Sequence, residues 1–389
     1  MIFNNYDNNS KNDILGYRIK EARIARGYTL DELADSINVT KQSISKYENN
    51  LAKISAENMI TISKLLNFPL TFFTKEKSII TSSTINDNPV FFRSLRKTSR
   101  RVKASLSQNL EFVEEFYSYF SKFIEFPKFN LDKNINLKYK LGASNNYIES
   151  VATKLREYWG LGDGPINDLT TILEKNGIII TRFKLDTHEV DAFSSITSSG
   201  TPIIVLGSDK KSAVRSRMDI AHELGHIVLH SNLSNEDLKL NHKVIEDEAN
   251  KFAGAFLLPD NRFSKDIYTI NIDTFVYLKT KWKVSIAAMI VRCYNLNLIT
   301  NDQYTYLFKR ISAKKWRTQE PLDDRIPFEK PKILREAIHL LIDNDILSIN
   351  ELVDNLAFSR KEIEKLCFLE DGYLGADENN IKPKLKIIK

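Results

Sequence analysis

Two histidines and a glutamate stand at a spacing that could hold a metal ion and hydrolyse a peptide bond. They form His222-Glu223-x-x-His226, within a run from Asp219 to His230. Positions i and i+4 are neighbours on one face of an α-helix, so both imidazoles can reach a single ion. Glu223 projects to the same side, where it can accept a proton from a water held by the ion. The pattern predicts a zinc-dependent hydrolase.

Two histidines at this spacing also occur on the surface of ordinary helices. Here the opposing arc of the helix is apolar, with Ile220, Leu224, Ile227 and Val228. Such an arc predicts a buried helix with one polar stripe. Because buried polar groups without partners are costly, and a metal ion would satisfy them, the flanking residues favour the metal site.

The motif does not supply a third protein ligand, which a catalytic zinc usually has. His230 continues the polar stripe, but its distance from His222 along the helix is about 12 Å, too far for one tetrahedral site. Six residues after His226, where another class of zinc proteases carries a histidine, the sequence has Asn232. These two failures leave an acid from a second helix as the alternative.

A second helix is predicted from Val244 to a stop at Pro259. Glu246 and Asn250 share one of its faces, and the small Ala249 lies beside them. Small residues would let this helix approach the first and bring the Glu246 carboxylate to the ion. Glu248 projects about 200° away and ranks second as the ligand.

This part of the chain resembles the ImmA/IrrE family of metallopeptidases. The resemblance rests on His222-Glu-x-x-His226, Glu246-x-x-x-Asn250 and Phe252-Ala-Gly-Ala-Phe-Leu-Leu-Pro259, and extends over residues 150–320. It implies zinc on His222, His226 and Glu246, with Glu223 as the base. Asn250 stands where related proteins often carry Asp. Outer partners of the ligands, or groups that stabilise the oxyanion, are then sought among His230, His242 and Asn250, with His242 expected in an exposed loop.

Residues 13–77 predict five short amphipathic helices. Thr29-Leu-Asp-Glu32 is a capping box, Asn38-Val39 makes a turn, and Thr40 caps a helix over 41–48. The two remaining helices are expected over 54–66 and 68–73. This arrangement is typical of a helix-turn-helix domain.

The string from Leu33 to Glu48 resembles the XRE (lambda-repressor-like) family. The resemblance implies that residues near the start of the recognition helix face base edges or phosphates of double-stranded DNA. These residues are Lys41, Gln42, Ser43, Ser45 and Lys46. Residues 11–80 carry 11 Lys/Arg against 8 Asp/Glu, a mild positive charge that predicts a homodimer for tight binding. The alternative is a module kept for dimerisation or protein binding.

The rest of the chain is predicted mostly helical. A Ser/Thr/Asn linker is expected over 78–89, followed by a basic run over 91–103 that reads as a solvated surface, with contact to phosphates as the alternative. A long packing helix is predicted over 106–126, a loop over 128–144, and short strands over 178–183, 191–195 and 203–206.

The fold class is therefore multidomain and mainly α. We expect an N-terminal five-helix helix-turn-helix bundle (11–77), a linker and connecting helix (78–145), an α+β zincin-like metallopeptidase domain with a small sheet (146–319) and a small helical C-terminal domain (332–375). Two cysteines in 389 residues predict buried thiols rather than a disulfide framework. The sequence shows neither a signal peptide nor an apolar run of membrane-spanning length, which predicts a cytoplasmic protein.

These features predict a zinc-dependent endopeptidase fused to a DNA-binding domain. The family resemblance implies a regulator that cleaves a repressor-like or antitoxin-like protein in a phage, mobile-element or stress response. The chain itself, at the linker 78–89, is a second candidate substrate. Two rival hypotheses are a helix-turn-helix regulator or antitoxin that retains the metallopeptidase fold without proteolysis, and an interaction scaffold built on the C-terminal helices.

Overall fold

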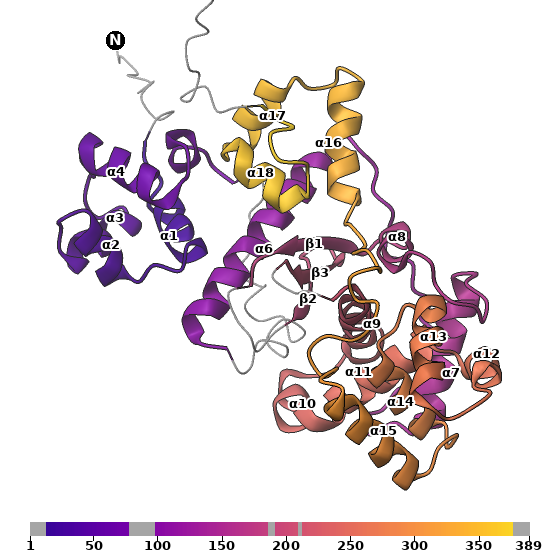
Figure 1. The fold of residues 1–389 in the computed structure, drawn as a ribbon. Helices are drawn as coiled ribbons and strands as arrows, with labels where there is room; N and C mark the ends of the chain where they lie inside the picture. The colour runs from indigo at the N-terminus through magenta and orange to yellow at the C-terminus, as the bar shows by residue number, and fades with distance from the viewer. Residues whose placement is uncertain (1–12, 78–97, 186–190, 209–211, 376–389) are drawn as a thin grey trace, which may run out of the picture. The chain divides into compact units, whose positions relative to one another are not determined.

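The structure, a computed structural model, describes residues 13–77, 98–185, 191–208 and 212–375. Its described residues fall into two compact units, one holding 13–77, 98–125 and 334–375, the other lying within 126–333 (Figure 1). The linker predicted over 78–89 and the first part of the basic run lie outside the described residues. None of the described helices combines the length and the hydropathy needed to cross a membrane.

The first unit is helical throughout its described residues. Its elements are α1 (Gly16–Ala25), α2 (Leu30–Ser36), α3 (Lys41–Glu48), α4 (Ala56–Leu66), the 3-10 helix η2 (Leu70–Phe73), α6 (Arg100–Phe120), α16 (Ile333–Asp343), α17 (Ile349–Leu356) and α18 (Arg360–Cys367).

The local signals predicted for the helix-turn-helix bundle are present. The Thr29 hydroxyl accepts a hydrogen bond from Glu32 N, and the Glu32 carboxylate accepts one from Thr29 N, which completes the capping box. Thr40 caps α3 by accepting from Ser43 N. Asn38 ends the turn before α3 with a φ of 54°, a left-handed conformation that asparagine tolerates. The fifth predicted helix is a short 3-10 turn rather than an α-helix.

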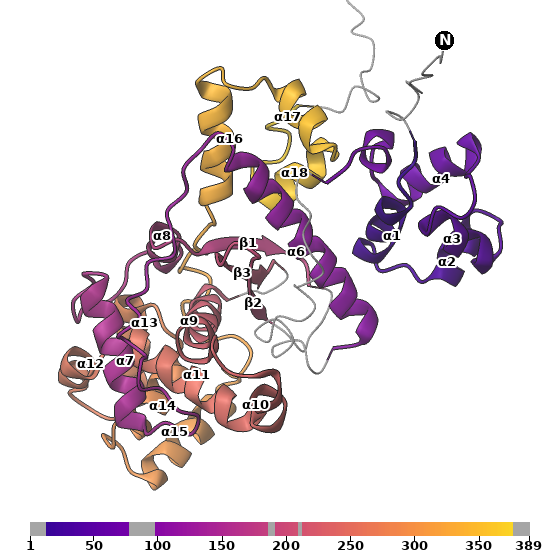
Figure 2. The same ribbon diagram turned by 180° about the vertical axis from the view of Figure 1, so that it is seen from behind.

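An aromatic cluster joins the three stretches of the first unit. The ring of Phe358, between α17 and α18, lies 5.0 Å from Phe72 of η2 and 4.9 and 4.8 Å from Phe112 and Phe116 of α6. The helix predicted over 106–126 begins earlier, at Arg100, because Ser99 caps it, and it ends at Phe120. The C-terminal segment thus contributes Phe358 to the apolar core of this unit, and α17 and α18 lie beside α6 (Figure 2).

The second unit surrounds a three-stranded sheet with helices. Its elements are α7 (Asn145–Tyr158), α8 (Leu169–Lys175), β1 (Ile179–Phe183), β2 (Ala192–Ile196), β3 (Pro202–Gly207), α9 (Ala213–His230), α10 (Asn235–Leu240), α11 (His242–Leu257), α12 (Asp260–Asp266), α13 (Ile272–Trp282), α14 (Ile286–Asn295) and α15 (Asn301–Ala313).

The sheet and two helices position the candidate site. The strand order is β1-β3-β2, with β1 parallel and β2 antiparallel to β3. Helix α9 packs on β2 and β3, and α11 packs on α7, α9 and α14. The apolar arc predicted for the first metal-binding helix is buried, since Leu224 and Val228 are fully enclosed. One boundary was predicted wrongly, because His242 begins α11 rather than lying in a loop before it.

Candidate metal centre and nucleic-acid interface

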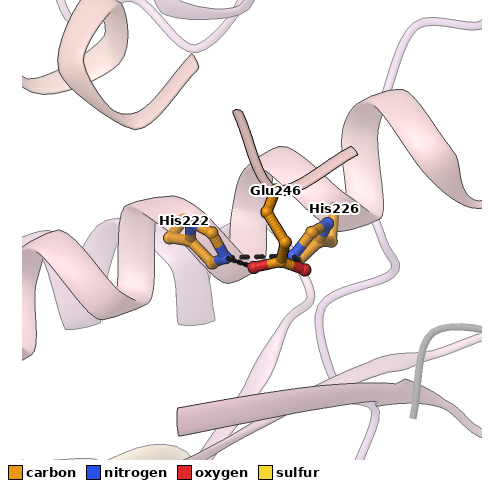
Figure 3. A group of neighbouring side chains, drawn as sticks. All are labelled: His222, His226 and Glu246. Carbon is orange, nitrogen blue, oxygen red and sulfur yellow. Dashed lines mark hydrogen bonds and ion pairs between the residues drawn. The ribbon is translucent and has the colours of Figure 1, made fainter. Parts of the chain in front are cut away.

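Helices α9 and α11 bring three predicted ligands together. The Nε2 atoms of His222 and His226 lie 3.0 Å apart on α9. The carboxylate of Glu246, on α11, faces both, with Oε2 3.3 Å from His222 Nε2 and Oε1 3.5 Å from His226 Nε2 (Figure 3). Together these side chains form a possible metal-holding group whose ligand atoms lie within 4.8 Å of one another.

The two helices can approach closely because small residues line their contact. A Cβ added to Gly225 would lie 3.2 Å from the carbonyl oxygen of Ala249 and 3.1 Å from Phe252 Cδ1. These distances are tighter than ordinary van der Waals contact, so a larger residue would push the helices apart. Ala249 lies one turn after Glu246, which means that this contact also sets how near the carboxylate comes to the imidazoles.

The outer nitrogen of His222 is held by Asn250. Asn250 Nδ2 donates to the carbonyl oxygen of Glu246 at 2.8 Å, which leaves Oδ1 as the acceptor for His222 Nδ1 at 3.1 Å. Asn250 thus contacts His222, and its role as an outer partner of a metal ligand stays a prediction. In many metal sites a carboxylate accepts a hydrogen bond from the outer N–H of the histidine ring. Here the amide oxygen of Asn250 accepts from His222 instead.

The outer nitrogen of His226 meets a second histidine. His226 Nδ1 lies 3.0 Å from His230 Nδ1, and His230 Nε2 lies 3.1 Å from Glu248 Oε2. His230 is fully buried and Glu248 is 2% exposed. Glu248, ranked second as a ligand from the sequence, is therefore not one of the three converging side chains, and it is linked to His226 through His230.

Glu223 is positioned by the sheet. It is 2% exposed, and its Oε2 accepts a hydrogen bond of 2.6 Å from the hydroxyl of Ser194 on β2. Ser194 was missed from the sequence, because a serine within a short strand carries no signal that connects it to a helix formed 29 residues later. Strand β2 thus fixes the side chain that the sequence predicts as the base.

The charges at the site reinforce one another. Burial opposes ionisation of Glu246, but its interactions with His222 and His226 outweigh burial and hold the pKa of this carboxyl far below its usual range. Burial also lowers the pKa of His222, yet its contact with Glu246 and the charge of Glu223 raise that pKa above the ordinary value overall. Glu246 is therefore ionised and supplies a negative charge beside the two imidazoles.

The ligand atoms fit zinc. Zinc–nitrogen and zinc–oxygen distances of about 2.0–2.2 Å in a tetrahedron require ligand atoms roughly 3.3–3.5 Å apart. The observed separations are 3.0, 3.3 and 3.5 Å. Among the described residues, Glu246 Oε1 is buried without a hydrogen-bond donor, as expected for an atom that coordinates an ion.

The remaining candidate, His242, lies at the start of α11, one turn before Glu246. It is half-buried, and the hydrogen bonds of the described residues do not connect it to the three ligand side chains. Two residues that sequence reasoning missed, Tyr139 and Ala143, contact Glu248 from the segment predicted as a loop. Their distance from the histidines in sequence left no pattern by which to find them.

The predicted DNA-contacting residues lie on α3, with their side chains at the surface. Lys41, Gln42 and Lys46 are exposed, and Ser43 and Ser45 are half-buried. Lys41 Nζ donates to Asp31 Oδ2 at 2.8 Å in an exposed ion pair. The scaffold behind them is buried, since Arg23 on α1 binds the carboxylate of Glu48 through two hydrogen bonds of 2.5 and 3.0 Å.

The basic run that precedes α6 is partly described. Arg101, at the start of α6, donates to the Glu32 carboxylate at the start of α2, at 2.8 Å. Both side chains are about half exposed, with 53% for Arg101 and 43% for Glu32. At this end of the run, Arg101 therefore forms a solvated ion pair with Glu32 of the helix-turn-helix bundle.

Family models match the two regions separately. Residues 19–73 match a model described as a helix-turn-helix, and residues 173–294 match a peptidase model described as an IrrE N-terminal-like domain. The chain thus joins a helix-turn-helix domain to an IrrE N-terminal-like domain, an organisation consistent with a transcriptional regulator.

Curated relatives are helix-turn-helix regulators. The HTH-type transcriptional regulator ImmR of Bacillus subtilis (strain 168) is 27% identical over 120 residues, which cover 26% of this chain and 94% of that protein. Uncharacterized HTH-type transcriptional regulators of Sinorhizobium medicae (strain WSM419) and Rickettsia prowazekii (strain Madrid E) are 36% identical over 59 residues and 33% over 70. These matches cover 15% and 16% of this chain and only 42% and 54% of those two proteins.

Proposed function

We propose that this chain is a zinc-dependent endopeptidase fused to a DNA-binding domain. It would act as a regulator that cleaves a repressor-like or antitoxin-like protein, or itself. The observation that carries the peptidase is the convergence of His222, His226 and Glu246 within 4.8 Å, with Glu223 buried beside them. The match to an IrrE N-terminal-like peptidase model over the same helices supports it.

The protein side chains have separable roles in this proposal. His222, His226 and Glu246 would hold the zinc, which when bound polarises the scissile carbonyl and makes a water acidic. Glu223 accepts the proton of the attacking water and delivers it to the leaving amine nitrogen. The Ser194 hydroxyl donates to one oxygen of Glu223 and so orients the carboxylate that would act as the base.

The test is a comparison of the full-length chain with its Glu223→Gln variant. Both should contain one zinc per chain, because Glu223 is not a ligand, whereas His222→Ala should lose it. Incubated with a proteome-derived peptide library, the wild type should yield cleavage products, and Glu223→Gln should yield them about 10²–10⁴-fold more slowly. A zinc-loaded wild type that cleaves no peptide in the library, and traps no protein through Glu223→Gln, would contradict the peptidase.

The rival function is a regulator that keeps this fold without proteolysis, and the names of the curated relatives favour it. In that case zinc would be structural or absent, and Glu223→Gln would change no measured property. DNA binding should survive in Glu223→Gln under either function. The peptide library therefore separates the two.

We further propose that the helix-turn-helix domain binds double-stranded DNA through α3, as a homodimer. Lys41, Gln42, Ser43, Ser45 and Lys46 are the proposed contacts. The exposure of Lys41, Gln42 and Lys46 supports this role, and so does the attachment of α3 to α1 through the buried Arg23–Glu48 pair. Lys41 would exchange Asp31 for DNA, since the exposed ion pair is weak.

A further inference from the structure

We propose that Glu248 and His230 are positioning residues that set the proton of His226 and so turn its Nε2 lone pair toward the metal. The inference rests on the proposed zinc site and extends it to residues that touch no substrate. The chain of contacts runs from Glu248 through His230 to His226, each within hydrogen-bond distance of the next.

Glu248 fixes the first proton. Its Oε1 accepts from the backbone N–H of Ala143 at 2.7 Å, and its Oε2 accepts from the hydroxyl of Tyr139 at 2.7 Å. The same Oε2 lies 3.1 Å from His230 Nε2. Because an ionised carboxylate only accepts hydrogen bonds, His230 must carry its proton on Nε2.

The second step transfers this constraint to the metal ligand. A neutral imidazole with a proton on Nε2 has a lone pair on Nδ1. His230 Nδ1 lies 3.0 Å from His226 Nδ1, so a neutral His230 requires His226 to donate from Nδ1 to complete the hydrogen bond. The Nε2 of His226 is then left with a lone pair, and it faces Glu246 and His222.

Burial makes this arrangement a property of the fold. His226 is 1% exposed, His230 is fully buried, and Glu248 is 2% exposed. Solvent therefore cannot exchange freely with these hydrogen bonds, and a wrong proton would leave a buried pair of facing donors or acceptors. His222 reaches the same state through one partner, because Asn250 Oδ1 accepts from its Nδ1.

The isosteric substitution Glu248→Gln should exchange donor and acceptor in each hydrogen bond between residue 248, His230 and His226. The amide oxygen of the new side chain would stay on the backbone N–H of Ala143, which can only donate. Its NH2 group would then face His230 Nε2, which must become an acceptor. The proton of His230 moves to Nδ1, His226 must accept there, and the Nε2 of His226 carries a proton where zinc should bind.

The direct test is ¹⁵N nuclear magnetic resonance of the full-length, metal-free chain labelled at its 6 histidines. His226 should be protonated at Nδ1 and His230 at Nε2, and both should switch in Glu248→Gln. Tyr139→Phe is the matched control, because it removes a donor to the same Glu248 oxygen and keeps the ring beside His230, so neither tautomer should change. Finding His226 protonated at Nε2 in the wild type would overturn the proposal.

Zinc affinity, measured by competition with a chelator, gives an independent readout. Loss of an outer partner typically weakens metal binding about 10–100-fold, so Glu248→Gln and His230→Phe should weaken it to this extent and Tyr139→Phe much less. If the wild type binds one zinc and both variants bind it equally well, the positioning role is wrong and the proposed function stands. If the wild type binds no zinc, the proposed function fails, while the tautomers still decide the hydrogen-bond chain.

Discussion

The two functional regions use polar side chains in opposite ways. At the helix pair α9–α11, His226 and Glu223 are buried, His222 and Glu246 are half-buried, and further side chains hold the polar groups in place, as Asn250 does for His222. On α3, the groups that would read DNA are exposed, and the buried polar contact lies behind them, between Arg23 and Glu48. One region positions its functional atoms, whereas the other positions only the helix that carries them.

This difference follows from what each partner supplies. A metal ion requires ligand atoms fixed to within a fraction of an ångström before it arrives, because its bonds are short and directional. A DNA duplex brings many groups of its own, so long side chains such as Lys41 can adjust on contact. We therefore expect substitutions in the two units to have different consequences, and four of them test the comparison.

The largest effect on stability is expected from Arg23→Ala. It would leave the Glu48 carboxylate buried without a cation, which typically costs about 3–5 kcal/mol. The stability of the helix-turn-helix bundle and its affinity for DNA should both fall. The zinc content should not change, because Arg23 and the proposed zinc ligands belong to different units. Lys41→Ala is the control, since its exposed pair with Asp31 is worth about 0.2–1 kcal/mol. Equal urea midpoints for the two variants would break the comparison.

Glu174→Gln tests a buried acid in the other unit. Glu174 is 5% exposed and accepts from the backbone N–H groups of Lys332 and Ile333. Burial raises the pKa of Glu174 to about 7 despite these hydrogen bonds. As pH rises from 4.5, the unfolded chain loses this proton first, so the stability of the wild type falls until the folded-state pKa is passed.

Glu174→Gln cannot ionise at this position. Its free energy of unfolding should therefore rise relative to that of the wild type between pH 5 and pH 8. The expected difference is about 2 kcal/mol, because each unit of pKa is worth about 1.4 kcal/mol. Urea unfolding of both proteins at the two pH values measures it. A difference that does not change with pH would contradict the raised pKa of Glu174.

Gly225→Ala should have a smaller effect on stability and a clear effect on zinc. The new methyl would press on the backbone of Ala249, and such overpacking typically costs about 1–3 kcal/mol. Zinc affinity should fall as well, because Glu246 moves with that backbone. Gly254→Ala, on the same helix pair, is the control. Its Cβ would meet only Arg292 Cδ at 3.7 Å, so helix propensity should make it stabilising by up to about 1 kcal/mol.

The same contrast decides what the sequence can predict. The convergence of His222, His226 and Glu246 was predictable because ligand chemistry and helical spacing leave few alternatives, and the capping box at Thr29 was predictable because it is local. Ser194 and Tyr139 were not, since they reach the site only through tertiary packing. The predicted domain bounds stay a prediction, but the position of Phe358 in the core of the first unit depends on contacts that no local pattern encodes.

Gln42→Ala should leave the fold unchanged and alter only DNA recognition. Gln42 is exposed, and glutamine can bond to adenine through two hydrogen bonds, worth about 1–3 kcal/mol of discrimination. On a duplex selected by the wild type from a random-sequence pool, the variant should lose preference at one or two base pairs. Lys46→Ala should instead weaken binding to all sequences and lower the salt slope by about 1, as expected for a phosphate contact. If both variants change only the salt slope, α3 binds DNA without reading it. In that case the exposed region would supply charge alone, and sequence selection would have to come from the second subunit or another element.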